Sequence, residues 1–255
     1  MSGSSESLIY PDWPAPDQVR AVITTRRGGV SAGSFASNNL ALHVGDDPQA
    51  VAANRADLSR QLGLSAEPQW LEQVHGIKVV EAQSDGLVRT ADGCITEQVG
   101  LACVVMTADC LPLLLCDRAG TQVAAVHAGW RSLAGGIVRE ALSQFSCSMD
   151  EVLVYLGPAI SQSQFEVGID VLEGFFETAL SPEHCDAISA AFRPSLSKPM
   201  KYYADLYQLA RAELNEVGVS QVFGGNFCTF EDEERFYSYR RDGQTGRMAS
   251  AIWLI

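Results

Sequence analysis

Two strongly apolar runs, separated by only four residues, place the tightest constraint on the fold. They cover residues 100–106 and 111–116, and the segment between them reads Thr107-Ala108-Asp109-Cys110. Short continuous apolar runs of this length are typical of fully buried strands. We therefore expect the chain to be built around a layered β-sheet, with Cys110 at a strand end.

The rest of the sequence alternates strand-like and helix-like segments. Further strands are expected at residues 19–24, 70–74, 78–82, 123–126, 152–156 and 248–255, and helices at about 46–62, 133–145, 169–180 and 205–217. Residues 182–199 begin and end near prolines and show little apolar periodicity, so they are expected to form a surface excursion. With neither a low-complexity linker nor a repeat, the pattern predicts the α+β class: a single layered α/β domain over residues 1–255, with mixed β-sheets flanked by helices.

Composition narrows the class of partner. The 255 residues are 47% apolar, enough for a substantial core, and carry a formal net charge of -13. Such an acidic chain without a basic cluster is not expected to bind nucleic acid, and the apolar runs are too short for a membrane span. A small-molecule substrate fits better, and the oligomeric state is left open.

The terminus and the cysteines indicate the compartment. Residues 1–8 are rich in serine and are expected to be flexible rather than a signal peptide. Seven cysteines, an odd number at irregular spacing, indicate free thiols in a reducing compartment. A cytoplasmic protein is the expectation.

Two of the four histidines share a local context with Cys110. His75 and His127 each stand where a strand gives way to a glycine-containing turn, and Cys110 stands between two strands. Strand ends can converge at one sheet edge, and two imidazoles with one thiolate suit zinc, or copper where it is available. Three protein ligands leave a fourth position open, as in catalytic zinc sites. The alternative is that each histidine is a hydrogen-bonded core or surface residue.

Three segments resemble a known family. They are WLEQVHG at residues 70–76, TADCLP at 107–112 and HAGWR at 127–131, and further matching blocks occur at residues 24–31, 39–40, 156–160 and 238–241. Together they resemble the multicopper polyphenol oxidase (laccase-like) domain family, whose members include purine nucleoside phosphorylases and the bacterial peptidoglycan editing factors. The resemblance implies that His75, Cys110 and His127 bind the metal. One departure is Ser132, where the family usually has glycine; a serine there could cap the following helix.

Other residues are weaker candidates for the site. Asp109 could be an acid or base in catalysis or could pair with an arginine, and Arg131 could bind phosphate near a helix start or form a surface ion pair. Arg26 and Arg240 are further candidates for substrate binding. Asn39 and His43 could line the pocket, whereas His184 lies in the expected surface excursion and is not assigned a role.

The resemblance implies a metal-dependent purine nucleoside enzyme. The expected reactions are phosphorolysis of adenosine, inosine and methylthioadenosine, with deamination of adenosine. One alternative is an amidase that removes a wrong serine from UDP-N-acetylmuramoyl-L-serine, with Cys110 as metal ligand or as nucleophile. A copper-dependent polyphenol oxidase is disfavoured because four histidines without a His-x-His pair are too few for several coppers. A non-catalytic metal-binding module is the last alternative.

Overall fold

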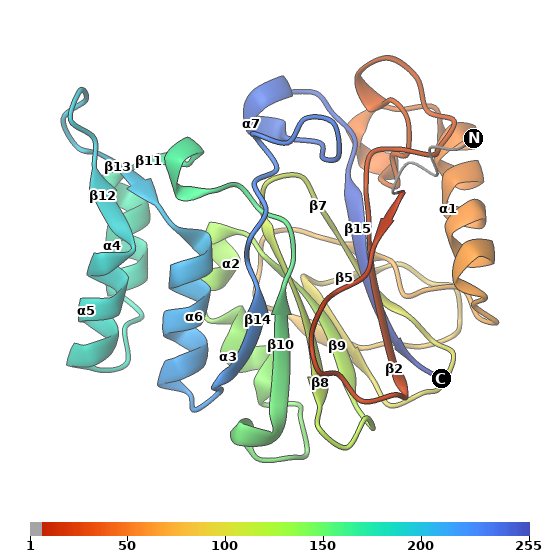
Figure 1. Cartoon of the computed structure of the whole chain (residues 1–255), viewed down its shortest axis with the longest axis horizontal. Helices are drawn as coiled ribbons and strands as arrows, with labels where there is room; N and C mark the ends of the chain where they lie inside the picture. The colour runs from red at the N-terminus through yellow and green to blue at the C-terminus, as the bar shows by residue number, and fades with distance from the viewer. Residues whose placement is uncertain (1–6) are drawn as a thin grey trace.

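Two β-sheets packed face to face form the centre of the molecule, with helices on both outer sides (Figure 1). The computed structural model describes residues 7–255. This arrangement of mixed sheets flanked by helices confirms the predicted fold class. Among the described residues, none of the helices combines the length and apolar character that a bilayer span requires.

The larger sheet has six strands in the order β14-β10-β8-β9-β6-β4. The bounds are β4 (Val79–Glu81), β6 (Gly93–Thr96), β8 (Leu111–Asp117), β9 (Val123–Ala128), β10 (Val152–Leu156) and β14 (Gln221–Gly224). The four central strands pair antiparallel, and β4 and β14 pair parallel at the two edges. A long crossover segment that contains several helices joins β10 to β14, as parallel pairing usually requires, whereas β4 and β6 are joined by the shorter segment 82–92.

The second sheet has four antiparallel strands in the order β1-β2-β15-β7. The bounds are β1 (Leu8–Ile9), β2 (Val19–Thr24), β7 (Cys103–Thr107) and β15 (Met248–Leu254). The two apolar runs of the sequence therefore enter different sheets, since β7 belongs to the smaller sheet and β8 to the larger. The chain crosses from one sheet to the other through residues 108–110, which places Cys110 between the two layers.

Burial on both faces explains why these strands are apolar without alternation. Along β8, Leu113 and Leu115 face the helices, whereas Leu114 and Cys116 face the smaller sheet. Successive side chains of a strand point to opposite faces, so a strand in an inner layer needs apolar residues at every position. Leu113, Leu114 and Leu115 are each at most 1% exposed.

Helices cover the two outer faces unequally. The larger sheet is covered by α2 (Trp130–Ala134) and α3 (Ile137–Leu142), outside which lie α4 (Ile169–Phe176), α5 (Pro182–Ala190) and α6 (Leu206–Glu216), all on one side in Figure 1. On the opposite side α1 (Pro48–Leu62) packs Leu58 against Val104 and Trp253 of the smaller sheet. The Asp47 side chain caps α1 by accepting the backbone N–H of Gln49.

Short elements complete the chain. A three-stranded sheet contains β11 (Glu166–Gly168), β13 (Lys201–Ala204) and β12 (Phe192–Pro194), and a parallel pair contains β3 (Leu71–Glu72) and β5 (Arg89–Thr90). The remaining helix is α7 (Tyr239–Asp242), and 3-10 turns occur at Gly33–Phe35, Leu42–Val44, Met149–Glu151 and Gln162–Gln164.

Three expectations about the elements need correction. Residues 182–199 are not a surface excursion, because they contain α5 and β12, and His184 is buried within 3.5 Å of the Glu213 carboxylate. The helix expected at 133–145 is divided into α2 and α3 by Gly135 and Gly136, and Gly136 has a φ of 92° that favours glycine. Of the terminus expected to be flexible, residues 1–6 lie outside the described part of the chain, and Leu8 already pairs with Thr24 in β1.

Candidate metal centre

His75, Cys110 and His127 converge although they come from three separate parts of the chain. His75 follows β3, Cys110 lies in the crossover between β7 and β8, and His127 is the penultimate residue of β9. The possible ligand atoms of the three residues all lie within 4.8 Å of one another. Cys110 Sγ is 3.8 Å from His75 Nε2, and the two imidazole rings lie edge to face with centroids 4.8 Å apart.

A buried carboxylate organises two of these residues. Asp92, which is fully buried, places Oδ1 2.8 Å from Nδ1 of His127. The same carboxylate accepts the backbone N–H groups of Val74, His75 and Gly76 at 2.7 to 3.2 Å. Asp92 therefore orients the His127 ring, leaving its Nε2 for a ligand, and fixes the loop that carries His75. A carboxylate behind a histidine in this way is common at zinc sites.

The backbone around the site is unusual. Among the described residues, the non-glycine residues with positive φ are His75, Asp109 and Met200, and the first two flank or belong to the cluster. Such conformations cost about 1–3 kcal/mol and persist where surrounding contacts impose them. Gly129 also matters, because a Cβ there would lie 2.9 Å from Cδ2 of His75 and 3.2 Å from Sγ of Cys110. A side chain at position 129 would therefore push the two donors out of place.

The cluster carries opposite charges when no cation is bound. Burial alone would raise the pKa of Cys110. The charges and hydrogen bonds of His127 and His75 have a larger, opposite effect and bring the pKa down to about 6. Burial alone would lower the pKa of His127. The charges and hydrogen bonds of Cys110 and Asp92 have a larger, opposite effect and bring the pKa up to about 9. Burial also raises the pKa of Asp92, and hydrogen bonds from His127 and Gly76 bring it below its ordinary value. Near neutral pH the metal-free site is therefore a thiolate beside an imidazolium and a carboxylate.

A cavity of about 390 Å³ opens onto the cluster. Its lining consists of His43, Gln73, His75, Met106, Thr107, Ala108, Cys110, His127, Tyr239 and Arg247. This volume is within the usual range for small-molecule sites. The donor atoms are therefore accessible to a ligand of moderate size.

Asp109, the neighbour of Cys110, is turned into the protein. Its Oδ1 accepts the hydroxyl of Thr229 at 2.6 Å, and its Oδ2 accepts the hydroxyl of Ser238 and the backbone N–H of Arg240. Asp109 is 9% exposed and does not line the cavity. In this conformation the carboxylate joins the crossover loop to the C-terminal segment, and its proposed acid or base role is not supported by its position.

The three arginines singled out from the sequence lie outside the cavity lining. Arg131 is exposed, with its guanidinium 4.3 Å from the centroid of the Trp130 ring. Arg26 donates to the backbone carbonyls of Ala36 and Glu233, and the Arg240 side chain donates to the carbonyl of Glu166. Their assigned roles in substrate binding or catalysis stay predictions.

Asn39 and His43 differ in their relation to the cavity. Asn39 is fully buried and its amide bonds to the backbone of Ala41 and Arg247 and to the Asp46 carboxylate, so it supports the loop below the site. His43 does line the cavity, as expected. Burial, followed by the charges of Arg247 and Arg55, lowers the pKa of His43.

Several residues of the site were not singled out from the sequence. Asp92 stands before Gly93 in what reads as a turn, and Arg247 lies in a Gly-Arg pair near the C-terminal strand. Gln73 belongs to one of the family-like blocks, but the sequence assigns it no role. Its side-chain amide donates to the backbone carbonyl of Met106 and accepts the backbone N–H of the same residue. Tyr239 immediately precedes Arg240 in another block. None of these residues has a spacing pattern that marks it, because the contacts join distant segments.

Ser132 does not cap a helix, contrary to the expectation. It lies inside α2, whose N-cap is Gly129, and its buried hydroxyl has no hydrogen-bond partner among the described residues. The substitution of the usual glycine by serine therefore adds an unsatisfied polar group rather than a cap.

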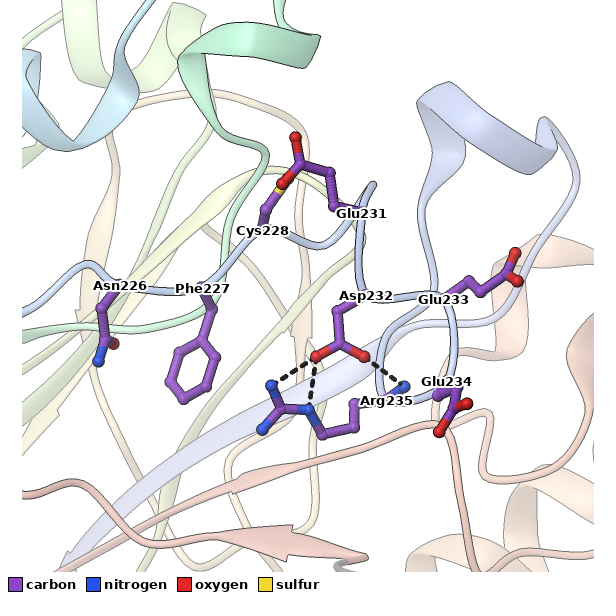
Figure 2. A pocket seen from close by; sticks show the side chains of 8 residues that line it. All are labelled: Asn226, Phe227, Cys228, Glu231, Asp232, Glu233, Glu234 and Arg235. Carbon is purple, nitrogen blue, oxygen red and sulfur yellow. Dashed lines mark hydrogen bonds and ion pairs between the residues drawn. The ribbon is translucent and has the colours of Figure 1, made fainter.

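A second cavity, of about 480 Å³, has a different character (Figure 2). Four of its lining side chains are acidic, namely Glu231, Asp232, Glu233 and Glu234. The others are Asn226, Phe227, Cys228 and Arg235. Its arginine is neutralised, because Nε of Arg235 lies 2.6 Å from Oδ2 of Asp232. This acidic cavity shares no lining residue with the cavity at the His/Cys cluster.

Comparison with known proteins assigns this chain to one family. Residues 20–255 match the family described as multi-copper polyphenol oxidoreductase laccase, and the chain belongs to it. It is 52% identical over 246 residues to a purine nucleoside phosphorylase of Pseudomonas aeruginosa, covering 96% of this chain and 98% of the relative. It is 48% identical to the purine nucleoside phosphorylase YfiH of Escherichia coli, covering 97% and 99%.

Solved structures show the same fold. A Neisseria meningitidis protein superposes with a TM-score of 0.91 at 48% identity, covering 97% of this chain and 99% of that one. YlmD of Geobacillus stearothermophilus superposes with a TM-score of 0.89 at 30% identity, covering 99% and 98%. The resemblance inferred from the sequence blocks is thereby confirmed.

Proposed function

We propose that this protein is a metal-dependent purine nucleoside phosphorylase, with one divalent ion held by His75, Cys110 and His127. The observation that carries the proposal is the convergence of the three donor groups, within 4.8 Å of one another, beside a cavity of ligand size. The names of the relatives that match over almost their whole length support the substrate class.

The donor set fits zinc. Ligands of a tetrahedral zinc ion lie about 3.5 Å apart, as follows from usual Zn–S and Zn–N distances. The 3.8 Å between Cys110 Sγ and His75 Nε2 is close to this value. Two imidazoles and a thiolate also bind copper, so copper is the second candidate. The three side chains leave a coordination position for substrate or water.

The chain's own residues prepare this site. Asp92 holds His127 with Nε2 free, and the lowered pKa of Cys110 provides the thiolate that a metal requires. When bound, the divalent ion supplies a Lewis acid at the cavity wall. Gln73 fixes the His75 segment to β7 through Met106, which keeps the donors in register with the cavity.

The proposed reaction is phosphorolysis of adenosine, inosine and methylthioadenosine. The bond between the purine nitrogen and C1′ of the sugar breaks, and a phosphate oxygen forms a new bond to C1′. The proton of hydrogen phosphate finishes on the purine nitrogen, so the products are the sugar 1-phosphate and the free base. Deamination of adenosine belongs to the same proposal: water adds at C6 of the purine and ammonia leaves.

A second candidate is amide hydrolysis, and it is favoured by the Cys110 thiolate 3.8 Å from an imidazole. In a metal-free form the Cys110 thiolate would attack the carbonyl carbon of the amide that joins serine to the UDP-muramoyl precursor. The C–N bond would break, serine would leave as the amine with a proton from the neighbouring imidazolium, and water would then hydrolyse the thioester to the free muramoyl carboxylate and the thiolate. A several-copper polyphenol oxidase is less well supported, since the chain has four histidines and one of them, His184, pairs with Glu213 outside the cavity. Seven free cysteines support a cytoplasmic location for either enzyme.

The test uses metal-quantified protein. Adenosine, inosine and methylthioadenosine are supplied with and without phosphate, and base, sugar 1-phosphate and inosine are measured by chromatography. The proposal predicts phosphate-dependent release of base that requires bound metal and is lost in Cys110→Ala. Full activity after complete metal removal would contradict it. Turnover of only a seryl UDP-muramoyl substrate by metal-free protein would instead establish the amidase.

A further inference from the structure

The cavity at the His/Cys cluster has an unusual charge for this protein. Although the chain carries a net charge of -13, no aspartate or glutamate within the described residues lines this cavity. Apart from the side chains of the His/Cys cluster itself, the strongly basic residue of its lining is Arg247, in the loop that leads into β15. The acidic cavity of Figure 2 is the opposite case, since four carboxylates line it and its arginine, Arg235, is paired with Asp232.

Arg247 lacks the partner that a half-buried arginine usually has. Its Nη1 donates to the backbone carbonyls of Thr245 and Gly246, at 2.8 and 3.0 Å, and no carboxylate of residues 7–255 forms an ion pair with it. Its guanidinium carbon lies 5.8 Å from the centroid of the Tyr239 ring, which also lines the cavity. The charges of Cys110 and Asp109 act on Arg247 from nearby but offset only part of the cost of burying its guanidinium. An anionic ligand would offset more of that cost.

Supporting residues hold Arg247 in place. Its backbone N–H donates to the buried amide of Asn39, so the position of the chain below the guanidinium is fixed. Arg55 adds positive charge that acts on His43 of the lining. Its guanidinium stacks on Trp70 and donates to the Leu40 carbonyl, and although the charge of Glu67 acts on it, no carboxylate of the described residues forms an ion pair with it. A guanidinium with donors to spare in a carboxylate-free cavity is suited to an oxyanion.

From this arrangement we infer that Arg247, with His43 and Tyr239 beside it, forms the subsite that binds inorganic phosphate. The inference rests on the proposed phosphorolysis and names the residue that receives its second substrate. It moves the phosphate site from Arg131 and Arg26, whose side chains lie outside the cavity lining, to the arginine that lines it. Arg247 would hold phosphate near the cluster while an oxygen of that phosphate forms the bond to C1′ of the sugar.

The experiment compares arginine variants of the metal-loaded protein. Arg247→Met removes the charge and keeps most of the volume, and Arg247→Lys keeps the charge without the bidentate geometry. The matched control is Arg193→Met, because Arg193 also lies over a tyrosine, Tyr203, but on an exposed strand away from the cavity. Arg131→Met tests the rival site. Metal content and unfolding temperature establish that each variant is folded.

Two readouts are measured: the KM for phosphate at saturating nucleoside, and the binding of inorganic phosphate alone by calorimetry. Arg247→Met is expected to raise the KM and Kd for phosphate by about tenfold or more, with the KM for nucleoside changed less than about twofold, because a charged hydrogen bond to phosphate is lost. Arg247→Lys should fall between, and Arg193→Met should match the wild type. An unchanged phosphate KM in Arg247→Met, or the increase appearing in Arg131→Met instead, would overturn the inference.

Failure of the proposed function gives a different pattern. If the wild type shows no phosphorolysis but binds inorganic phosphate, and Arg247→Met abolishes this binding, the anion subsite stands and the phosphorylase proposal falls. If the wild type performs phosphorolysis and Arg247→Met retains normal phosphate binding, the phosphorylase proposal stands and the subsite falls. If the wild type neither turns over nor binds phosphate, both are wrong.

Discussion

Oδ1 of Asp92 lies 2.8 Å from Nδ1 of His127, and both side chains are almost completely removed from solvent. Asp92 also accepts the backbone N–H of His75, so one carboxylate fixes two of the three proposed metal ligands. A buried carboxylate in this position increases the basicity of the histidine and sets its ring orientation. The organisation of the site therefore depends on Asp92 as much as on the ligands themselves.

Replacing this carboxylate should weaken metal binding without removing a ligand. Asp92→Asn is expected to lower zinc affinity by about 10- to 100-fold, because His127 loses its charged partner. Competition with a chromophoric chelator measures the change. The control is Asp150→Asn, an exposed carboxylate in the 3-10 turn before β10, which should bind zinc normally. Equal affinity in Asp92→Asn and the wild type would show that Asp92 has no part in the site.

Zinc affinity should increase with pH over a defined range. In the metal-free protein the pKa is about 6 for Cys110 and about 9 for His127, so between these values the thiolate is present and His127 carries a proton. Zinc must displace that proton, and the apparent affinity should therefore rise by about tenfold per pH unit from about pH 6 to 9 and level off above. Below about pH 6 the dependence should steepen as Cys110 is protonated.

Calorimetry in buffers of different ionisation enthalpy checks this directly. Release of about one proton per zinc at pH 7.5 is expected. Release of two protons would mean that Cys110 is still a thiol at that pH, and no release would mean that His127 is already neutral.

The strands of the core were predictable because their physical signal is local. Residues 19–24 and 152–156 form strands at the expected positions, and burial on both faces makes such segments continuously apolar. The sequence of residues 182–199 does not reveal α5, because this helix has only a weak apolar face, with Ile188 and the polar His184 as its buried residues. Its helix is stabilised by packing on α6, which periodicity within α5 does not reveal.

Asp109→Asn should lower the stability of the protein without changing the amount of zinc that it binds. An asparagine cannot accept hydrogen bonds from Thr229, Ser238 and the Arg240 N–H together, so unfolding free energy should fall by about 2–3 kcal/mol with zinc stoichiometry unchanged. Urea denaturation measures this loss. Thr229→Val, which removes one of the bonds, should cost about 1 kcal/mol. A large loss of kcat in Asp109→Asn with normal stability would instead support proton transfer by Asp109.

Two serines offer a matched pair for the contribution of buried hydroxyls. Ser132→Ala is expected to leave stability unchanged or to raise it by about 1 kcal/mol, because the hydroxyl it removes has no partner. Ser238→Ala should lower stability by about 1–3 kcal/mol, because that hydroxyl donates to Asp109 and caps α7 through the Arg241 N–H. Thermal unfolding of both variants is the measurement. Equal destabilisation by the two would contradict the hydrogen-bond assignment.

Some residues of the site can be recognised from the sequence next to them, and others only from contacts with distant segments of the chain. His75, Cys110 and His127 were identified by their strand-end context and by the family blocks, and the structure brings them together. Asp92 and Arg247 were missed because their roles arise from contacts with segments far away in the chain. Arg131 was favoured because it lies near a helix start, but its guanidinium stacks on Trp130 outside the cavity. Position along the chain therefore indicates the proposed ligands but not the residues that orient them or the arginine beside them.

X-ray absorption at the zinc edge of the loaded protein tests the central claim most directly. We expect one sulfur at about 2.3 Å, two imidazole nitrogens at about 2.0 Å and one further light atom that exchanges with solvent or substrate. Cys110→Ala should lose the sulfur shell, whereas the same substitution at Cys185, a half-buried thiol of α5, should leave it intact. A spectrum without sulfur, or with four protein ligands, would contradict an open site at His75, Cys110 and His127.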